Sequence, residues 1–146
     1  GGWNGSSSAE KQAEHEADVY AISQLEKTFH EAISKKDLAG MMSIWAPNAS
    51  FTYGPGQTAT GTQQIKQFWT TAKVFNHPGV WVSDHPAWKM RVTVNGDRGT
   101  LHFECHIIDV DTGKVVATTA ADQDVSRVNG RWLITSMVGG TTELSA

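Results

Sequence analysis

Hydrophobic side chains recur every three or four residues in the first part of the chain. Over residues 18–36 they repeat at the spacing of one helix face, which predicts a long amphipathic helix ending near Lys36. The apolar face of this helix consists of Ile22, Leu25, Phe29, Ala32 and Ile33. Asp37 is a suitable N-cap for a second, shorter helix over residues 38–46, which must stop before Pro47.

A short strand and a third helix are predicted next. The strand covers residues 50–53, and the glycine- and proline-containing stretch 54–61 breaks it. The helix covers residues 62–73, and Thr62 can cap it. Its apolar side consists of Ile65, Phe68, Trp69 and Ala72.

After residue 79 the pattern changes to the alternation of strands. Five strands are predicted, over residues 80–83, 87–94, 99–110, 114–128 and 131–138. The sequences NGD, DTGK and NG separate the last four and are typical of hairpin turns. Helices followed by an antiparallel meander indicate an α+β domain, with the helices packed on one face of a curved sheet.

The turns also predict which residues lie side by side on neighbouring strands. Two-residue loops are expected at residues 96–97 and at residues 129–130. They set Met90 opposite Phe103, Trp88 opposite Cys105, and Val125 opposite Ile134. Each pair is apolar, so the turn assignment and the hydrophobic pattern agree.

The middle hairpin has two alternatives. A two-residue loop would place Asp122 and Asp124 on the apolar face, and burying unpaired carboxylates costs several kcal/mol. A three-residue loop over residues 112–114 avoids this and is preferred. The inner face of the sheet is then Leu101, Phe103, Cys105, Ala117, Thr119, Ala121, Gln123, Val125 and Ser136.

His102, Glu104 and His106 fall on the opposite, outer face of the sheet. In the preferred register the charged rows are Arg91–His102–Asp124 and Lys89–Glu104–Asp122. Residues two apart on a strand lie about 6.5–7 Å apart, so a flat row converges poorly on an ion. The pattern favours a solvated or subunit-contacting face over a metal or catalytic site, and no metal is expected.

Composition narrows the class of protein. The 146 residues suffice for one domain, expected over residues 13–146 after a flexible segment or tag at 1–12. A net charge of −3 with scattered Lys and Arg gives no nucleic-acid or anionic-membrane surface. No apolar run approaches the roughly 20 residues that cross a bilayer. The single cysteine excludes an internal disulfide and leaves the compartment open, cytoplasmic or secreted.

Several stretches, taken in order, resemble the SnoaL-like branch of the nuclear transport factor 2-like superfamily. They are the segment 22–56, the G-x-x-x-I-x-x-F start of the third helix, VTVNGDRGTLHFECHIID, DTGK and the terminal NGRWLI. The resemblance covers about 120 residues and depends on order and spacing. It implies a cone, or cystatin-like α+β roll, in which a curved antiparallel sheet wraps around the long N-terminal helix and leaves a pocket at the open end.

The resemblance also implies where a catalytic pair would lie. Dehydrating members use a His–Asp pair, and His85 matches the histidine, which comes just before the strand that leads into the V-x-V-x-G-D turn. The aspartate comes three residues before the acidic residue of the helix junction, here Asp37, and that position holds Ser34. The acid of the pair is therefore missing. Asp84 and Glu31 are nearby replacements, although Asp84 points away from His85 if both lie on a strand.

Other candidate residues come from their places in the expected cone. Tyr53 ends the first strand near the pocket mouth, so Tyr53 and His85 are the candidate catalytic residues. Candidate ligand contacts are Trp69, Trp88, Phe103, Cys105 and Gln123. Cys105 has no basic neighbour on its own face, which argues against a thiolate nucleophile. His15 and His30 are expected at exposed helix positions.

Two functions are compatible with these features. The first is a cofactor-independent lyase, isomerase or cyclase that acts on a small apolar or cyclic molecule through a histidine general acid/base. The second is a non-catalytic ligand-binding or assembly module, which the serine at the acid position favours. A homodimer is expected through the outer face, which is too apolar for full exposure at Val116, Thr118, Ala120, Leu133 and Met137.

Overall fold

The computed structural model describes residues 7–76, 80–82 and 89–143. The helices are α1 (Ser8–Lys35), α2 (Leu38–Met42), α3 (Gly61–Thr71) and α4 (Lys73–Asn76). The strands are β1 (Trp45–Gly54), β2 (Gln57–Thr60), β3 (Val80–Val82), β4 (Lys89–Asn95), β5 (Arg98–Asp109), β6 (Lys114–Val128) and β7 (Arg131–Glu143). Within these residues, no helix is long and apolar enough to span a membrane.

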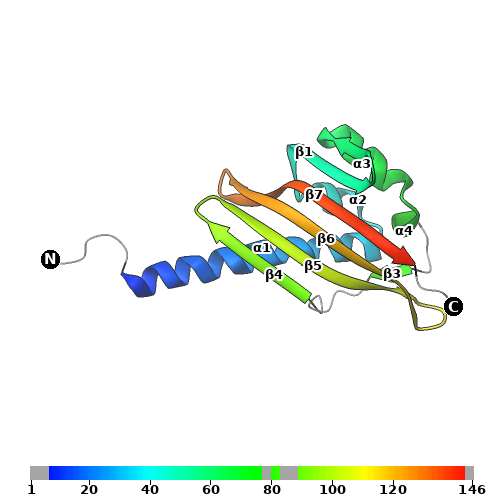
Figure 1. The fold of residues 1–146 in the computed structure, drawn as a ribbon, viewed down its shortest axis with the longest axis horizontal. Coiled ribbons are helices and arrows are strands. Elements are labelled where there is room, and N and C mark those ends of the chain that lie inside the picture. The colour runs from blue at the N-terminus through cyan, green and yellow to red at the C-terminus, as the bar shows by residue number, and fades with distance from the viewer. Residues whose placement is uncertain (1–6, 77–79, 83–88, 144–146) are drawn as a thin grey trace.

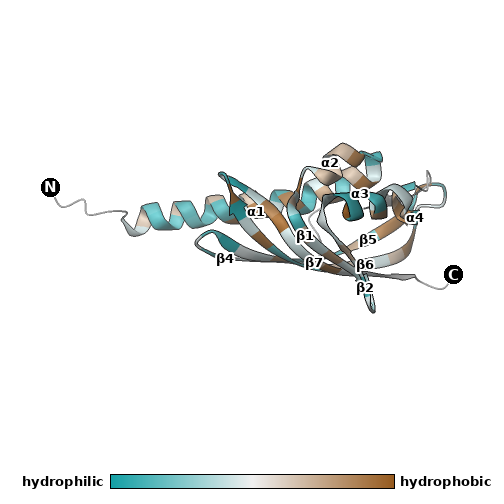
Figure 2. Ribbon diagram, turned by 90° about the horizontal axis from the view of Figure 1, so that it is seen from above, coloured by the Kyte–Doolittle hydropathy of each residue, from teal (hydrophilic) through white to brown (hydrophobic). Residues whose placement is uncertain are grey.

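One curved sheet lies against the helices (Figure 1). Its strand order is β2-β1-β7-β6-β5-β3, and β4 pairs with β5 as well. All pairs are antiparallel except β1 with β7. Figure 2 shows α1 running along one side of the sheet, with α2 and α3 covering one end and the first part of α1 projecting beyond it. The α+β cone predicted from the sequence is confirmed.

Helix α1 begins ten residues before the predicted start. The side chain of Ser7 accepts a hydrogen bond from the Glu10 amide at 3.1 Å, which caps the first turn. Lys36 ends the helix in the left-handed conformation at φ 57°. The predicted apolar face is buried, and three polar residues are buried with it: Glu26, His30 and Ser34.

The second helix is shorter than predicted. It ends at Met42, and the chain from Trp45 becomes β1, with Ile44 accepting a hydrogen bond from the Ile134 amide at 2.8 Å. The buried run Ile44–Ala46 is held by this pairing with β7, which overrides its helical spacing. Residues 57–60, predicted to be a breaker, form β2.

The middle hairpin keeps the predicted faces but not the predicted pairs. His102 lies opposite Asp122 rather than Asp124, and Glu104 lies opposite Ala120. The turn spans residues 110–113, because the Asp109 carboxylate accepts hydrogen bonds from the Asp111 and Thr112 amides. A bulge also lies between Ile107 and Ile108. The combined shift is two residues, so every side chain stays on its predicted face.

A second bulge changes two residues of β7. The pairs Met90–Phe103 and Val125–Ile134 are as predicted, but the register of β6 with β7 shifts between Asp124 and Val125. Met137 therefore lies opposite Gln123 on the inner face, and Ser136 turns to the outer face, where its hydroxyl donates to Asp124 at 2.8 Å. The predicted places of Met137 and Ser136 were wrong, because a bulge inverts the alternation.

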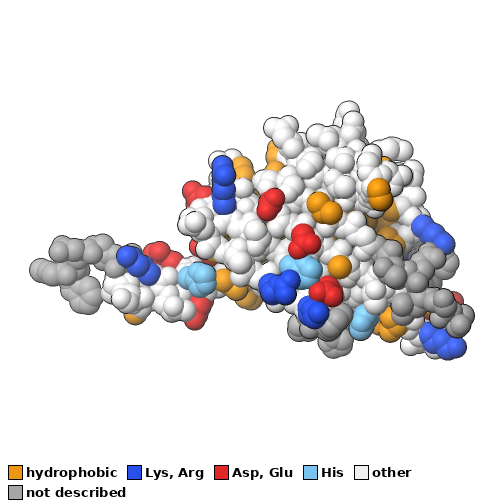
Figure 3. Space-filling view, viewed as in Figure 1, with side chains coloured by type: hydrophobic (Ala, Val, Ile, Leu, Met, Phe, Trp, Pro, Cys, Tyr) orange, Lys and Arg blue, Asp and Glu red, His pale blue; other side chains and the backbone are white. Residues whose placement is uncertain are grey.

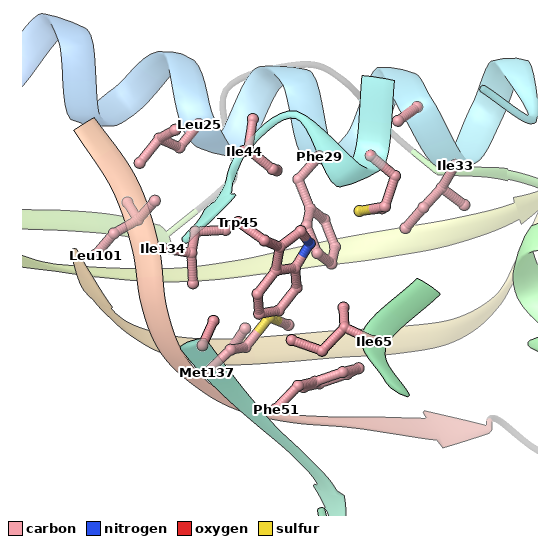
Figure 4. Packing of buried hydrophobic residues seen from close by; sticks show 14 of the residues in the cluster. Leu25, Phe29, Ile33, Ile44, Trp45, Phe51, Ile65, Leu101, Ile134 and Met137 are labelled. Atoms are coloured by element: carbon pink, nitrogen blue, oxygen red, sulfur yellow. The ribbon is translucent and has the colours of Figure 1, made fainter. Parts of the chain in front are cut away.

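The core fills the space between α1 and the inner face. Figure 4 shows Leu25, Phe29 and Ile33 of α1 pointing toward the sheet, with Trp45, Phe51 and Met137 packed beside them. Aromatic rings form much of this core; Phe51 and Trp69 stack with centroids 5.6 Å apart. Outside the core, the Arg127 guanidinium of β6 donates hydrogen bonds to Asp18 of α1 at 2.8 Å and to Asp97, in the turn between β4 and β5, at 2.9 Å. Arg127 thereby joins α1 to the sheet.

The packing makes a quantitative prediction about stability. Leu101, on β5, is 1% exposed, so Leu101→Ala should lower the free energy of unfolding by about 2–5 kcal/mol through lost burial and a residual cavity. Val110, at the β5–β6 turn, is 52% exposed, and Val110→Ala should change the free energy of unfolding by about 0.5 kcal/mol or less. Urea denaturation of both variants measures the difference. Equal losses would contradict the assigned inner face.

Candidate active site

A cavity of about 260 Å³ lies between α1, α3 and the inner face of the sheet. Five aromatic residues form much of its wall: Phe29, Phe51, Tyr53, Phe68 and Trp69. The polar groups in the wall come from Tyr53, Trp69, Thr119 and His30. Met137 also lines the cavity, which follows from the bulge in β7. A concave, mainly apolar space with a few polar groups is typical of a small-molecule site.

His30 is the one cavity-lining histidine among the described residues, and a buried carboxylate holds it. His30 and Glu26 lie one turn apart on α1, and His30 Nδ1 forms a short hydrogen bond with Glu26 Oε1. The two residues are 0% and 4% exposed. The carboxylate accepts from Nδ1–H, which leaves the lone pair of a neutral ring on Nε2. His30 Nε2 is buried and has no hydrogen-bond partner among the residues that the structure describes.

Cys105 completes this polar cluster from β5. Its Sγ atom lies 3.7 Å from Glu26 Oε1 and 3.6 Å from His30 Nδ1. Burial, reinforced by the charge of Glu26, raises the pKa of the thiol to about 12. The thiol is therefore protonated near neutral pH and donates to the carboxylate. The conclusion from the sequence, that Cys105 is not a thiolate nucleophile, agrees with this, but the reason is burial, because the structure places the His30 ring beside the thiol.

The prediction that His30 is exposed was wrong. Ile22, Glu26, His30 and Ser34 are spaced four residues apart and form one buried row along α1. The curved sheet covers a wider arc of the helix than the apolar spacing alone indicated. A signal was present in the sequence, since Glu26 and His30 continue the row that begins at Ile22. Ser34, at the expected acid position, lies on the same row, one turn beyond His30.

The predicted site residues fall into four groups. Tyr53, which is 36% exposed, and Trp69 line the cavity. Phe103 and Cys105 contact His30 instead; the Phe103 and His30 rings meet edge to face at 4.9 Å. Gln123 is buried beside the cavity-lining Met137, and its amide nitrogen lies 3.3 Å from the Met137 sulfur. The remaining two predicted residues, His85 and Trp88, lie outside the described residues.

The outer face carries a second histidine cluster. His102 Nδ1 lies 2.7 Å from Asp122 Oδ1, and Nε2 lies 2.9 Å from Glu104 Oε2. Figure 3 shows histidine, acidic and basic side chains gathered on this face of the sheet. The hydrogen bond to Glu104, followed by that to Asp122, raises the pKa of His102 above its usual value. The prediction that His102 and Glu104 face away from the core is confirmed.

The His102 cluster gives a prediction about pH. The raised pKa means that protonated His102 stabilises the fold below its unfolded pKa of about 6.5, and this contribution is lost as pH rises through the folded pKa. An NMR titration should show the His102 pKa above about 6.5. Glu104→Gln and Asp122→Asn should each lower it, because the hydrogen bond to Glu104 and then the hydrogen bond and charge of Asp122 raise the pKa. A wild-type value at or below that of a free histidine would contradict this assignment.

The fold is an α+β cone, and a mainly apolar cavity lies between its helices and the inner face of the sheet. The SnoaL-like domain family matches residues 14–138, so this chain belongs to that family. A search of curated proteins finds no match.

Solved structures support the same fold. A nuclear transport factor 2-like protein from Novosphingobium aromaticivorans superposes with a TM-score of 0.75 at 15% identity, over 98% of this chain and 95% of the other. A candidate dehydratase from Streptomyces avermitilis gives 0.69 at 17% identity, over 90% and 99%. A candidate ketosteroid isomerase from Shewanella frigidimarina gives 0.66 at 18% identity, over 82% and 94%. At these identities the likeness concerns the fold alone.

Proposed function

We propose that this chain is a cofactor-independent enzyme of the lyase, isomerase or cyclase type, acting on a small apolar or cyclic molecule. One observation carries the proposal. His30 forms part of the cavity wall, with one ring nitrogen held by a buried carboxylate and the other buried with no hydrogen-bond partner within residues 7–76, 80–82 and 89–143. A general base needs this combination: a fixed tautomer, a nearby charge that stabilises the imidazolium, and a free lone pair.

The chemistry is a proton transfer through His30. A small movement of the cavity wall exposes the buried Nε2, which removes a proton from a carbon of the bound molecule, and Glu26 stabilises the imidazolium that forms. The imidazolium then returns the proton to another carbon, which isomerises the molecule, or gives it to a leaving hydroxyl, which releases water. The apolar surroundings strengthen the electrostatic attraction between Glu26 and the imidazolium. Neither route needs an oxidant or a reductant.

The cavity wall also favours a ligand of one type. Phe29, Phe51 and Phe68 offer flat apolar surfaces to a ring, and about 260 Å³ is near the lower limit of ordinary ligand sites. The Tyr53 hydroxyl and the Trp69 indole N–H supply hydrogen-bond donors for a substrate oxygen. Trp69 Nε1 is buried and has no hydrogen-bond partner among the described residues, which suits that role. A small ring compound bearing oxygen fits these groups.

The sequence-based role of His85 remains a separate prediction. If His85 is the general acid/base, as the resemblance implies, His85→Ala should lower turnover by about 100-fold to 10,000-fold. Both histidines can act in one enzyme, one as base and the other as acid. Replacing each one separately distinguishes their contributions.

The central test replaces His30. Its change to Gln removes the base but keeps a hydrogen-bonding side chain, and should lower turnover by about 100-fold to 10,000-fold. Glu26→Gln should lower turnover as well, because a neutral amide no longer stabilises the imidazolium. The matched control is His102→Gln, which removes a histidine bound to two carboxylates on the outer face. Turnover is measured on a panel of small hydroxylated, halogenated or keto ring compounds.

Three outcomes discriminate between the functions. Full turnover in His30→Gln, with correct folding by circular dichroism, would remove His30 from the mechanism and leave His85 as the base. A wild type that binds ring compounds, detected by tryptophan fluorescence, but converts none would favour the binding module. Loss of turnover in His102→Gln as well would mean that the histidine effect is not specific to the cavity.

We also propose that two copies pair through the outer face of the sheet. Val116 and Val138 lie on this face, 36% and 59% exposed, beside the exposed Ala120. Burying such side chains against a second copy removes apolar surface from water.

Light scattering tests this assembly. The wild type should be a dimer at micromolar concentration, and Val116→Arg with Val138→Arg should give a monomer, because the added charges would be buried unpaired. Val110→Arg, at the exposed turn, should leave the mass unchanged. A monomeric wild type would contradict the proposal.

A further inference from the structure

The Cys105 thiol has no part in the proton transfer, yet it lies against both residues that do. Together with Glu26 and His30 it brings a sulfur, an oxygen and a nitrogen within 4.8 Å of one another. These residues come from two elements, α1 and β5, and all three are buried. Three different metal-binding atoms therefore converge inside an apolar core.

The sulfur distances fit a metal ion. Zinc bonds of about 2.3 Å to sulfur and about 2.0–2.1 Å to nitrogen or oxygen place tetrahedral ligand atoms roughly 3.5 Å apart. Cys105 Sγ lies 3.6 Å from His30 Nδ1 and 3.7 Å from Glu26 Oε1. The remaining pair, Glu26 and His30, is hydrogen-bonded and would have to separate by about 1 Å. Rotation of the Glu26 side chain can supply that movement.

The charges and the types of ligand atom also select the ion. A thiolate and a carboxylate together neutralise a divalent cation, so the bound site would carry no net charge in its apolar surroundings. Sulfur and imidazole ligands favour zinc or cobalt, whereas magnesium and calcium prefer oxygen ligands alone. The outer-face cluster of His102, Glu104 and Asp122 contains no sulfur and offers a natural comparison.

We propose that Glu26, His30 and Cys105 form a binding site for a thiophilic divalent cation such as Zn²⁺. On binding, Cys105 loses its proton to solvent, and the His30 proton moves from Nδ1 to Nε2 as Nδ1 takes the metal. One proton is released for each ion bound. This departs from the expectation of no metal, which rested on the outer-face residues.

The site has a consequence for the proposed function, on which this part of the inference rests. With a metal on Nδ1, Nε2 carries the ring proton and has no lone pair, so His30 cannot act as a base. The metal would therefore switch the enzyme off, and proton transfer would require the metal-free protein.

Cobalt binding tests the site without any need for activity. The full chain is treated with a chelator and titrated with Co²⁺, and absorption from thiolate-to-cobalt charge transfer is recorded in the near ultraviolet. The chain has one cysteine, so this absorption reports Cys105 alone. One equivalent of Co²⁺ should produce the band, and Zn²⁺ should abolish it by displacement.

Four variants assign the ligands. Cys105→Ser should lose the band, Glu26→Gln and His30→Gln should weaken cobalt binding at least about tenfold, and His102→Gln should retain the wild-type affinity. Circular dichroism confirms that each variant is folded. No band in the wild type at millimolar cobalt would overturn the site. Wild-type affinity in both Glu26→Gln and His30→Gln would overturn it too, since cysteine alone would then bind the ion.

Inhibition separates the two proposals. A wild type that turns over a ring compound should lose activity on adding Zn²⁺ and regain it with a chelator. A cobalt band without turnover on any compound would support the metal site and count against the enzyme. Turnover that saturating Zn²⁺ leaves unchanged would overturn the inhibitory role and leave the acid–base proposal standing.

Discussion

The packing of α1 against the inner face of the curved sheet is the interaction on which the rest of the structure depends. A helix against a flat surface buries one narrow stripe, whereas a sheet that curves around it covers a wider arc. The extra arc buries Glu26, His30 and Ser34 beside the apolar stripe. The candidate site therefore arises directly from the way the core is formed.

Burying ionisable groups in this core is costly unless they are paired. Glu26 accepts hydrogen bonds from both His30 and Cys105, so its carboxylate is well satisfied, while His30 Nε2 finds no partner in the described part of the chain. The aromatic rings around the cluster exclude water and strengthen its electrostatics. Such arrangements of buried ionisable groups beside a cavity are concentrated at functional sites. The proposed acid–base catalysis and the proposed metal binding both rest on this one cluster.

Much of the sheet could be predicted from turn residues and alternation. The two-residue turns at 96–97 and 129–130 set the pairs Met90–Phe103 and Val125–Ile134. The middle hairpin kept its faces because its turn and bulge together shift the register by an even number of residues. The single bulge between Ile134 and Ser136 of β7 had the opposite effect and moved Met137 into the cavity wall. The hydrophobic pattern around Met137 did not reveal that extra residue.

The sequence by itself determined the order of most elements, the family, the outer placement of His102 and the aromatic character of the cavity. These features follow from local periodicity, turn chemistry and motif order. Only the tertiary structure decided that Glu26 and His30 are buried, because the curvature of a sheet formed from residues 45–143 sets how much of α1 it covers. The contact between Cys105 and His30 joins residues 75 positions apart. No local pattern encodes such a distance, so the cluster emerged only when helix and sheet packed together.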